Sequence, residues 1–432
     1  MKRYDSYKDS GVKWLGEIPS HWEMLALKHI LKLKKEIVGK RADQFDLLSL
    51  TLRGIIKRDI ENPEGKFPES FDSYQVVKPN DFIFCNFDNE ETPRAVGLSS
   101  YKGMITGAYD VLYRKSNKLT DKFLIYYFLY IDDAKRFKPL YKGLRKTIPF
   151  DSFMSYKIPV PSLKEQDRIV AYLDATTSKI DEAIAQQQKM IDLLNERKQI
   201  IINNAVTKGL NPNAPMKDSG IERIGLIPNH WLTKRLEYCI DILPGYAFSS
   251  QDFVERGIKL LRGVNVAPET IRWDDIVYWD KDLDESLEKY LLKENDLVLG
   301  LDRPWIGSGT RVTLVKKEDL PCLLVQRVCR IRVANDMSIK YLYYLLSNKL
   351  FYDALGVDTT GVSVPHLSTE QIKKVIMPIP MLSEQNSIVE YIEKQIASVN
   401  NAILAANEQI SLLQERKQII INDVVTGKVK VI

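Results

Sequence analysis

Side chains that can read nucleic-acid bases recur in loops that follow short apolar runs. Arginine can bind a guanine edge with two hydrogen bonds, asparagine and glutamine can do the same for adenine, and lysine mostly contacts phosphates. In the first half of the chain the candidates are Arg53, Lys57, Arg58, Arg94, Arg145, Lys146 and Thr147. In the second half they are Arg262, Asn265, Arg303, Trp305, Gln326 and Arg327. Trp305 is included because an exposed ring can stack on a base, although surface charge or ordinary packing accounts for each of these residues equally well.

The sequence gives little support for catalysis, because the nuclease-like Glu-x-Lys spacings that it contains are routine in charged chains. No GxxxxGK phosphate loop occurs, so nothing indicates ATP binding by this chain. Adenine methyltransferases carry Asn-Pro-Pro followed by an aromatic residue, and neither Asn62-Pro63 nor Asn211-Pro212 continues in that way. His21 and His230 each stand before a tryptophan, where packing and hydrogen bonding are commoner roles than metal binding. We therefore predict no catalytic residue and no metal site.

The elements that must position the candidate side chains are two long helices, because one stretch of sequence occurs twice. Residues 161–209 return as residues 380–428 at a constant spacing. Within these stretches, residues 196–203 and 415–422 both read ERKQIIIN. An unchanged run of that length indicates an internal repeat.

Both copies show the apolar repeat of 3.5 residues that is typical of a coiled coil. The repeat predicts one long helix in each copy, about 60 Å in length for roughly 40 residues. A single amphipathic helix more often covers its own domain, but two matched seams of equal length favour pairing with each other. Lys198 and Lys417 occupy matching seam positions, where we expect an exposed rod end rather than a register-setting contact or a contact with acidic residues of a partner. The principal seam residues are Leu173, Ile180, Ile184, Ile191, Leu194, Ile201, Ile392, Val399, Ile403, Ile410, Leu413 and Ile420.

Two globular segments accompany the helices, and each mixes short apolar strands with one or two helices, as expected of an α+β fold. The predicted division is 1–160 for an N-terminal arm and first domain, 161–210 for the first long helix, 211–379 for a linking arm and second domain, and 380–432 for the second long helix. Both arms share the pattern G-x-I-P-x-H-W. The second arm directly follows the first helix, so symmetry predicts that the N-terminal arm adjoins the end of the second helix. The two chain ends should then be neighbours.

The composition is that of a globular protein with a mild positive charge. The net charge is +5, from 62 basic and 57 acidic residues, and 44% of the residues are hydrophobic. This balance permits a polyanionic partner without demanding one. No window approaches 18 apolar residues and the N-terminus has no apolar core, so we expect a cytoplasmic protein with no membrane contact. Four cysteines without a CxxC pair are typical of reduced, buried thiols.

The combination of these features resembles the specificity subunit of type I restriction-modification systems over the whole chain. The resemblance is carried by the P-x-P-x-L-x-E-Q pattern at 159–166 and 378–385, by the shared ERKQIIIN run and by the arms. It implies two target-recognition domains, each reading one half of a split double-stranded DNA sequence. It also implies two DNA adenine methyltransferase subunits docked on the helices, and restriction (translocase) subunits recruited by the larger assembly. S-adenosylmethionine, ATP and Mg are then expected on those partners, and none on this chain.

The order of domain, helix, domain, helix constrains the geometry. The helices must run antiparallel if their seams are to meet, which predicts a pseudo-two-fold internal repeat and an antiparallel two-helix coiled coil that separates the two domains. Such a protein can contact DNA grooves about one turn, roughly 34–36 Å, apart. Because the domains differ in sequence, the two half-sites should differ as well. The competing hypothesis is a scaffold whose domains bind proteins, and a steep loss of duplex binding between about 50 and 200 mM salt would favour DNA recognition.

Overall fold

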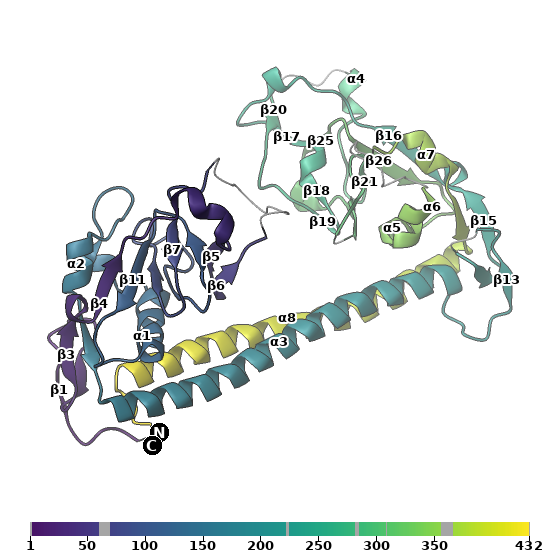
Figure 1. Ribbon diagram of the computed structural model, residues 1–432. Coiled ribbons are helices and arrows are strands. Elements are labelled where there is room, and N and C mark those ends of the chain that lie inside the picture. Colours follow the sequence, from purple (N-terminus) through teal and green to yellow (C-terminus); the bar gives the residue numbers. More distant parts are fainter. Residues whose placement is uncertain are drawn as a thin grey trace. The chain divides into compact units, whose positions relative to one another are not determined.

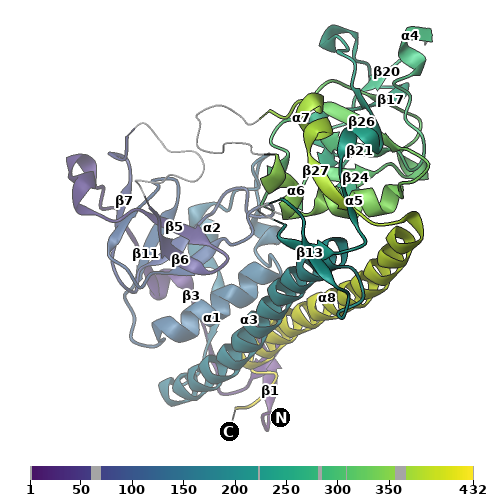
Figure 2. The same ribbon diagram turned by 90° about the vertical axis from the view of Figure 1, so that its right-hand side faces the viewer.

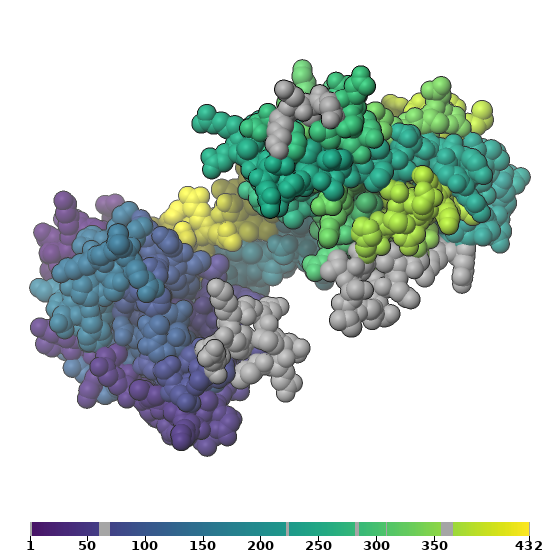
Figure 3. Space-filling model, turned by 90° about the horizontal axis from the view of Figure 1, so that it is seen from above, coloured from purple at the N-terminus to yellow at the C-terminus, as the bar shows by residue number. Residues whose placement is uncertain are grey.

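The computed structural model describes residues 2–59, 70–221, 224–280, 285–307, 309–355 and 366–431. The Asn62-Pro63 pair noted above lies outside the described residues. The chain divides into two compact units (Figure 1), Met1–Gln188 with Asn407–Ile432, and Lys189–Ala406. Each unit holds one globular domain, coloured purple to blue or teal to green in Figure 3, together with a segment of both long helices.

The core of the first unit is an antiparallel sheet of four strands in the order β4-β11-β8-β9. Alternate residues of β8 enter different hydrophobic clusters, as the two-residue period of a strand requires. Phe82 and Phe84 contact the ring of Phe128 in α1, whereas Ile83 packs with the strands on the other face. Both faces are covered, which explains the uninterrupted apolar run of β8. The elements are β4 (Leu31–Lys34), β8 (Phe82–Phe84), β9 (Val96–Leu98), β11 (Asp110–Arg114) and α1 (Asp121–Asp133).

Shorter elements surround this sheet. Two antiparallel pairs, β5 with β6 and β7 with β10, supply the cluster on the face opposite α1. Two further pairs, β1 with β2 and β3 with β12, connect the arm with the strand that leads into the first long helix. Their bounds are β1 (Tyr7–Asp9), β2 (Glu17–Pro19), β3 (Glu23–Ala26), β5 (Leu48–Thr51), β6 (Gly54–Lys57), β7 (Gln75–Val77), β10 (Gly103–Ile105), α2 (Phe150–Ser155) and β12 (Lys157–Val160), with short 3-10 turns at Leu27–His29, Gly39–Gln44 and Lys138–Leu140.

The second unit repeats this core with the sheet order β16-β26-β21-β24. Leu299 and Ile331 belong to the cluster that contains Tyr341 of α5, whereas Val298 packs with Leu324 on the opposite face. The second domain also has a three-stranded sheet, β20-β17-β25, in which β17 and β25 are parallel. The main elements are β16 (Ile240–Pro244), β17 (Ile258–Leu261), β20 (Tyr278–Trp279), β21 (Leu297–Gly300), β24 (Val312–Leu314), β25 (Cys322–Leu324), β26 (Val328–Val333) and α5 (Ile339–Ser347).

The remaining elements of the second unit are short. The pairs β13 with β14 and β15 with β27 correspond to the arm pairs of the first unit. The pairs β18 with β19 and β22 with β23 form small hairpins. The bounds are β13 (Met216–Asp218), β14 (Leu226–Pro228), β15 (Leu232–Arg235), β18 (Val266–Ala267), β19 (Thr270–Ile271), α4 (Glu285–Glu288), β22 (Trp305–Ile306), β23 (Gly309–Thr310), α6 (Lys349–Ala354), α7 (Thr369–Lys374) and β27 (Ile376–Ile379), with 3-10 turns at Leu236–Tyr238, Ser250–Asp252, Gly263–Asn265 and Lys317–Asp319.

The first turn of the first long helix, α3 (Leu163–Lys208), contains the buried glutamine Gln166. The Gln166 side-chain amide donates to the carbonyls of Pro161 (2.9 Å) and Lys118 (2.8 Å), and its oxygen accepts from the backbone N–H of Thr120 (2.8 Å). Thr120 also caps α1. One side chain therefore joins the start of the long helix to the start of the domain's own helix, and α1 lies beside α3 (Figure 2), where the Tyr126 hydroxyl donates to Asp174 Oδ1 (2.8 Å).

The second long helix, α8 (Leu382–Val425), begins in the same way. The Gln385 amide donates to the carbonyls of Pro380 (2.9 Å) and Asp336 (3.1 Å), and its oxygen accepts from the backbone N–H of Ser338 (2.7 Å). Ser338 caps α5. The glutamine of the P-x-P-x-L-x-E-Q pattern therefore has the same three backbone partners in both copies, as a buried amide requires.

The repeated histidines lie beside these helix starts. His21 Nε2 lies 3.1 Å from Glu165 Oε2, and His230 Nε2 lies 2.9 Å from Glu384 Oε2. The tryptophan that follows each histidine is fully buried. The hydrogen-bonding role favoured from the sequence is confirmed for both histidines.

Each long helix ends at a glycine that is covered by an arm. Gly209 and Gly427 have left-handed backbones, with φ of +69° and +74°, as is usual for the residue that follows a helix. A β-carbon at Gly427 would lie 2.4 Å from Pro19 and 3.0 Å from Trp22, and one at Gly209 would lie 3.2 Å from Trp231. The N-terminal arm therefore adjoins the end of the second helix, as the repeat predicts.

The second helix is shorter than the predicted range of 380–432, because the left-handed Gly427 prevents continuation beyond Val425. The last residues instead contact the N-terminus. The backbone N–H of Lys430 donates to the carbonyl of Lys2 (2.9 Å), and the Tyr7 hydroxyl donates to the carbonyl of Gly427 (3.2 Å). The prediction that the chain ends are neighbours is confirmed.

Within each unit, the segments of α3 and α8 lie side by side and run in opposite directions (Figure 1). In the first unit, Leu173 near the start of α3 shares a hydrophobic cluster with Val424 near the end of α8. In the second unit, Val206 near the end of α3 shares one with Ile392 near the start of α8. All the predicted seam residues are buried or half-buried, so the heptad pattern identified the inward side of each helix.

The expectation of an exposed rod end at the two seam lysines is wrong. Lys198 is 9% exposed, and its Nζ lies 2.8 Å from both carboxylate oxygens of Glu269 in the second domain. Lys417 is half-buried, and its Nζ lies 2.7 Å from both carboxylate oxygens of Asp181 on α3. Both lysines hold ion pairs because an ammonium group in an apolar seam needs a partner, and such pairs favour one register.

The buried glutamines give a first testable prediction. We expect Gln166→Leu and Gln385→Leu each to lower the free energy of unfolding by about 2–3 kcal/mol, because three backbone groups lose their partner. Urea denaturation followed by circular dichroism measures the change. Gln186→Leu, an exposed position on α3, is the control and should change the value by less than about 0.5 kcal/mol. Equal effects at the buried and exposed positions would contradict this account of the helix start.

Candidate nucleic-acid interface

In the first domain, two loops that are distant in sequence meet beyond the end of β8. The backbone N–H of Asp88 donates to the carbonyl of Arg145 (2.8 Å). Asp88 has a left-handed backbone (φ 47°), which turns the chain toward the loop that precedes α2. We name residues 86–91 and 142–147 the Arg145 surface. It brings together three of the predicted candidates, Arg145, Lys146 and Thr147.

The cations of the Arg145 surface are paired with carboxylates of the neighbouring loop. Arg145 Nη2 lies 2.7 Å from Asp88 Oδ2, and this contact raises the pKa of Arg145. Lys146 Nζ lies 2.5 Å from Glu90 Oε2, and the hydrogen bonds from Lys138 and Lys146 lower the pKa of Glu90 to about 2. Exposed ion pairs add little stability. A phosphate or a base edge can therefore replace these carboxylates at small cost.

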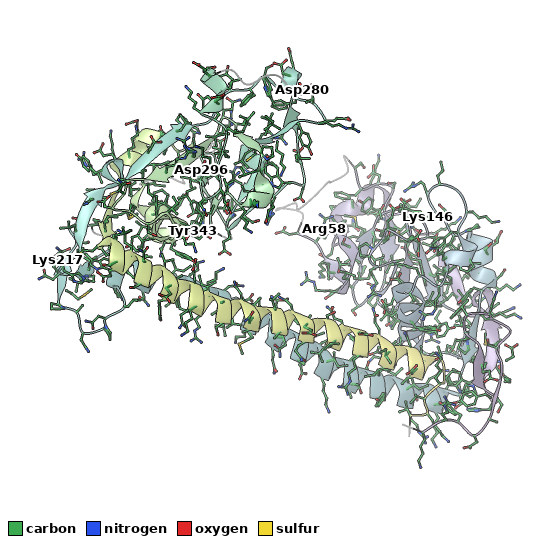
Figure 4. The ribbon with its side chains drawn as sticks, turned by 180° about the vertical axis from the view of Figure 1, so that it is seen from behind. Arg58, Lys146, Lys217, Asp280, Asp296 and Tyr343 are labelled. Carbon is green, nitrogen blue, oxygen red and sulfur yellow. The ribbon has the colours of Figure 1, made fainter. Side chains whose placement is uncertain are left out.

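Three other candidates of the first domain lie on and after the β5–β6 hairpin. Arg53 is exposed at the turn. Lys57 is exposed and its Nζ lies 2.7 Å from Asp46 Oδ2, and Arg58 directly after it is half-buried. Figure 4 labels Arg58 and Lys146, which lie on different parts of the domain surface. The structure therefore divides the candidates of this domain between two places.

Three candidates are engaged inside their own domains. Arg94 is half-buried, and its Nη1 lies 2.9 Å from Asp133 Oδ1. Asn265 is 1% exposed, and its amide donates to the carbonyl of Asp275 (3.0 Å). Arg262 Nη2 donates to the same carbonyl (2.7 Å). Asn265 cannot reach a base without leaving its buried position, and turning Arg94 or Arg262 outward would break the contacts that they make within their domains, so we leave all three out of the proposed interface.

In the second domain, a corresponding surface forms around the loop after β21. The Asp302 carboxylate lies 2.7 Å from Arg327 Nη1 and 2.7 Å from His366 Nδ1. Burial raises the pKa of Asp302, but the hydrogen bonds from His366 and Arg327 outweigh burial and leave the pKa below its ordinary value. Arg303 and Gln326 are exposed beside this group. We name Asp302, Arg303, Gln326, Arg327 and His366 the Arg327 surface.

Arg311, which no sequence pattern singles out, holds the loops of the second domain together. Its Nε donates to the carbonyl of Val266 (2.9 Å), and its Nη1 donates to the carbonyl of Asp302 (2.7 Å). Its own backbone N–H donates to the carbonyl of Pro304 (2.7 Å). Burial lowers the pKa of Arg311. Because its partners are carbonyls from distant loops, only the fold reveals this positioning role.

Trp305 is half-buried and not a free stacking platform. Its ring lies 5.6 Å from the ring of Tyr352 in α6, at an interplanar angle of 37°. Ile306, next to it in β22, is exposed. The indole therefore packs within the domain, and the adjoining hairpin tip presents apolar surface.

The cysteines of the chain are buried thiols, as the sequence indicated. All four are free, and burial raises the pKa of Cys322 and Cys329 to about 12. Such thiols are not nucleophiles at neutral pH. Over the described residues, no group of three or more His, Cys, Asp or Glu is placed to hold a metal ion. Within those same ranges, no helix combines the length and apolar character needed to cross a membrane.

A second candidate surface lies on the long helices. Leu193 and Ile200 of α3 are each 51% exposed, and Leu412 and Ile419 of α8 are 51% and 50% exposed. Each pair is spaced by seven residues and so occupies one face of its helix. The two pairs hold the same place relative to the ERKQIIIN run. The two pairs are therefore a candidate binding surface for a partner.

Comparison with known proteins places these features in a family. The family model for the type I restriction modification DNA specificity domain matches residues 99–191 and 257–410. The type I restriction enzyme MjaVIII specificity subunit of Methanocaldococcus jannaschii is 30% identical over 434 residues, which cover 98% of this chain and 97% of that protein. The type I restriction enzyme EcoAI specificity subunit of Escherichia coli is 30% identical over 252 residues, which cover 58% of this chain and 42% of that protein.

A solved structure shares the fold. Its chain comes from work on complex assembly and conformational transition of the type I R-M system, and it superposes with a TM-score of 0.66 at 15% identity, covering 95% of this chain and 99% of that chain. The matches define a class of non-catalytic protein that recognises DNA sequence. The chain belongs to the family of specificity subunits of type I restriction-modification systems. The resemblance stated from the motifs is thereby confirmed.

The role of Arg311 gives a second testable prediction. We expect Arg311→Met to weaken binding of the specific duplex by about tenfold or more, because the loops of the Arg327 surface lose two charge-assisted hydrogen bonds. Fluorescence anisotropy on the specific and on a scrambled duplex measures this effect. Arg235→Met, at an exposed position in β15, is the control. An equal loss on both duplexes would show instead that Arg311 contacts phosphate directly.

Proposed function

We propose that this chain binds an asymmetric bipartite duplex DNA target and directs methyltransferase and restriction subunits to it. The observation that carries the proposal is a contrast between the two units. Their helix starts and helix ends make the same contacts, whereas the loops beyond their central strands present different side chains. The Arg145 surface offers Arg145, Lys146 and Thr147, and the Arg327 surface offers Arg303, Gln326 and Arg327. Two domains that share the same helix contacts but differ in these loops are suited to two half-sites of different sequence.

An antiparallel two-helix coiled coil is the spacer in this proposal. The opposite directions of α3 and α8 within each unit and the burial of the seam residues support it. In the proposed arrangement, domains at 1–160 and 211–379 are related by a pseudo-two-fold axis between helices at 161–210 and 380–425. Duplex DNA has a matching local dyad, so both domains would enter grooves about one turn, roughly 34–36 Å, apart. The helices would then fix the length of the unread sequence.

The chemistry of the two surfaces suits groove recognition. Arg145 and Arg327 are each oriented by a carboxylate in an exposed pair, so a phosphate can take the place of the Asp88 carboxylate, and a guanine edge or a phosphate can take the place of the Asp302 carboxylate. Gln326 is exposed and can bind adenine. Arg53 and Lys57 on the β5–β6 hairpin would add phosphate contacts.

The two leucine-isoleucine pairs support two copies of one partner. Leu193 with Ile200 and Leu412 with Ile419 present the same residue types in the same sequence context. We assign these pairs to two DNA adenine methyltransferase subunits, and restriction subunits would join the resulting complex. S-adenosylmethionine, ATP and Mg would then be bound by those partners.

Mapping of methylated adenines tests the proposed function. The host genome is compared with and without the gene for this chain. Loss of a single two-part motif is expected, with different sequences in its two halves. An unchanged methylation pattern would remove the main support for the proposal.

The salt dependence of duplex binding separates DNA recognition from a protein-binding scaffold. A protein that neutralises several phosphates weakens by orders of magnitude between about 50 and 200 mM salt. Anisotropy titrations at several salt concentrations give the slope. A scaffold without a DNA role would show no specific duplex binding at any salt concentration.

Partner stoichiometry gives a further testable prediction. We expect the double variant Leu193→Ser with Ile200→Ser to bind one methyltransferase copy, because only one of the two apolar pairs remains. The variant Leu412→Ser with Ile419→Ser should also bind one copy. Native mass spectrometry counts the subunits, and Leu232→Ser, an exposed leucine in β15, is the control. Two bound copies in both double variants would contradict the assignment of these pairs.

A further inference from the structure

Leu144 is the most exposed large apolar side chain among the described residues. It lies at the tip of the loop before α2, with a relative exposure of 103%. A single exposed leucine on a protein surface needs no explanation. Leu144 differs because the hairpin that carries it is closed and anchored, and because cations flank it.

The hairpin is closed by backbone hydrogen bonds. Lys142 and Thr147 exchange both N–H to carbonyl bonds, each of 2.9 Å. The N–H of Lys146 donates to the carbonyl of Gly143 (3.1 Å), and both residues have left-handed backbones, with φ of 45° and 69°. These bonds hold Leu144 away from the domain instead of letting it fold back onto apolar surface.

The hairpin is also anchored to the domain behind it. The Arg145 carbonyl accepts from the backbone N–H of Asp88, and the Arg145 guanidinium pairs with the Asp88 carboxylate. The same guanidinium lies over the Phe87 ring, 4.9 Å from its centroid. The backbone hydrogen bond and the ring contact would remain when a phosphate replaces the Asp88 carboxylate, so the loop next to Leu144 stays attached to the end of β8.

Charges flank the apolar tip on both sides. Lys142 precedes Leu144 by two residues, and Arg145 and Lys146 follow it directly. Proteins that bend DNA insert an apolar side chain between base pairs from the minor groove, while nearby cations hold the phosphates. Arg145 and Lys146 are paired with Asp88 and Glu90 in exposed ion pairs, which phosphates can replace, so an exposed leucine between these cations suits this contact.

We propose that Leu144 is a wedge that enters the minor groove and partly unstacks one base step in the half-site bound by the first domain. The inference rests on the proposed function and adds a means of reading sequence without hydrogen bonds to bases. Pyrimidine–purine steps unstack most easily. The wedge would therefore favour a flexible step at one position of the target.

The experiment uses the chain assembled with its methyltransferase partners, on duplexes that carry the target found by methylation mapping. The fluorescent base 2-aminopurine is placed at one step at a time, away from the methylated adenine. For the wild-type chain we expect increased fluorescence at one step. Leu144→Ala should abolish most of that increase and weaken target binding by about tenfold, since the unstacked step loses its apolar contact.

Two variants keep the test specific. Leu144→Met retains an apolar side chain of similar length, so it should keep both the fluorescence and the affinity. Leu226→Ala removes another exposed leucine, in β14 of the second unit, and should change neither. If the wild-type complex binds its target but no step responds, or if Leu144→Ala behaves as wild type, the wedge is overturned and the proposed function stands. If the wild-type complex binds no duplex specifically, the proposed function falls and the wedge falls with it.

Discussion

The structure depends on a buried amide at the start of each long helix. Gln166 and Gln385 each satisfy three backbone groups, one of which belongs to the first turn of the domain's own helix. Because Gln166 and Gln385 are themselves fully buried, neither amide can lose these contacts without leaving its own donors and acceptor unpaired. The orientation of a domain on its helix is therefore set by hydrogen-bond geometry and not by apolar contact alone, and the proposed spacer role requires that rigidity.

The two copies of the long helix differ in the contacts of their seam lysines. Lys198 reaches Glu269 in the second domain, whereas Lys417 reaches Asp181 on the other long helix. The second domain is thus held at its helix start and again further along the rod. Among the described contacts, the equivalent lysine does not make this second attachment for the first domain. The repeated lysine thus has a different partner in each copy, because Glu269 lies in a domain that has diverged from the first, whereas Asp181 lies on the other long helix.

The long helices could be predicted from the sequence because burial along a helix follows a period, and the seam residues are buried or half-buried as the heptads required. The site could be predicted only in part. Arg94 and Arg145 are both arginines in polar loops, yet one lies against Asp133 inside the domain and the other stays exposed. Asn265 is buried, and Arg311 joins the carbonyls of two other loops. The residues next to each of them in the sequence do not indicate either contact. Contacts between residues far apart in the chain decide these cases.

The loops of the Arg145 surface and the Arg327 surface contain residues with a left-handed backbone, which has an energetic cost. Asp88 and Arg303, which follow the central strands, have φ of 47° and 43°, and Lys146 and Arg327 have φ of 45° and 67°. A left-handed conformation disfavours most side chains by about 1 kcal/mol or more, and β-branched residues most of all. As lineages diverge, these four positions can exchange cheaply only with glycine, asparagine or aspartate. Substitutions that change the DNA target would therefore fall on the residues beside these four positions, and the conformation of the turns would stay nearly the same.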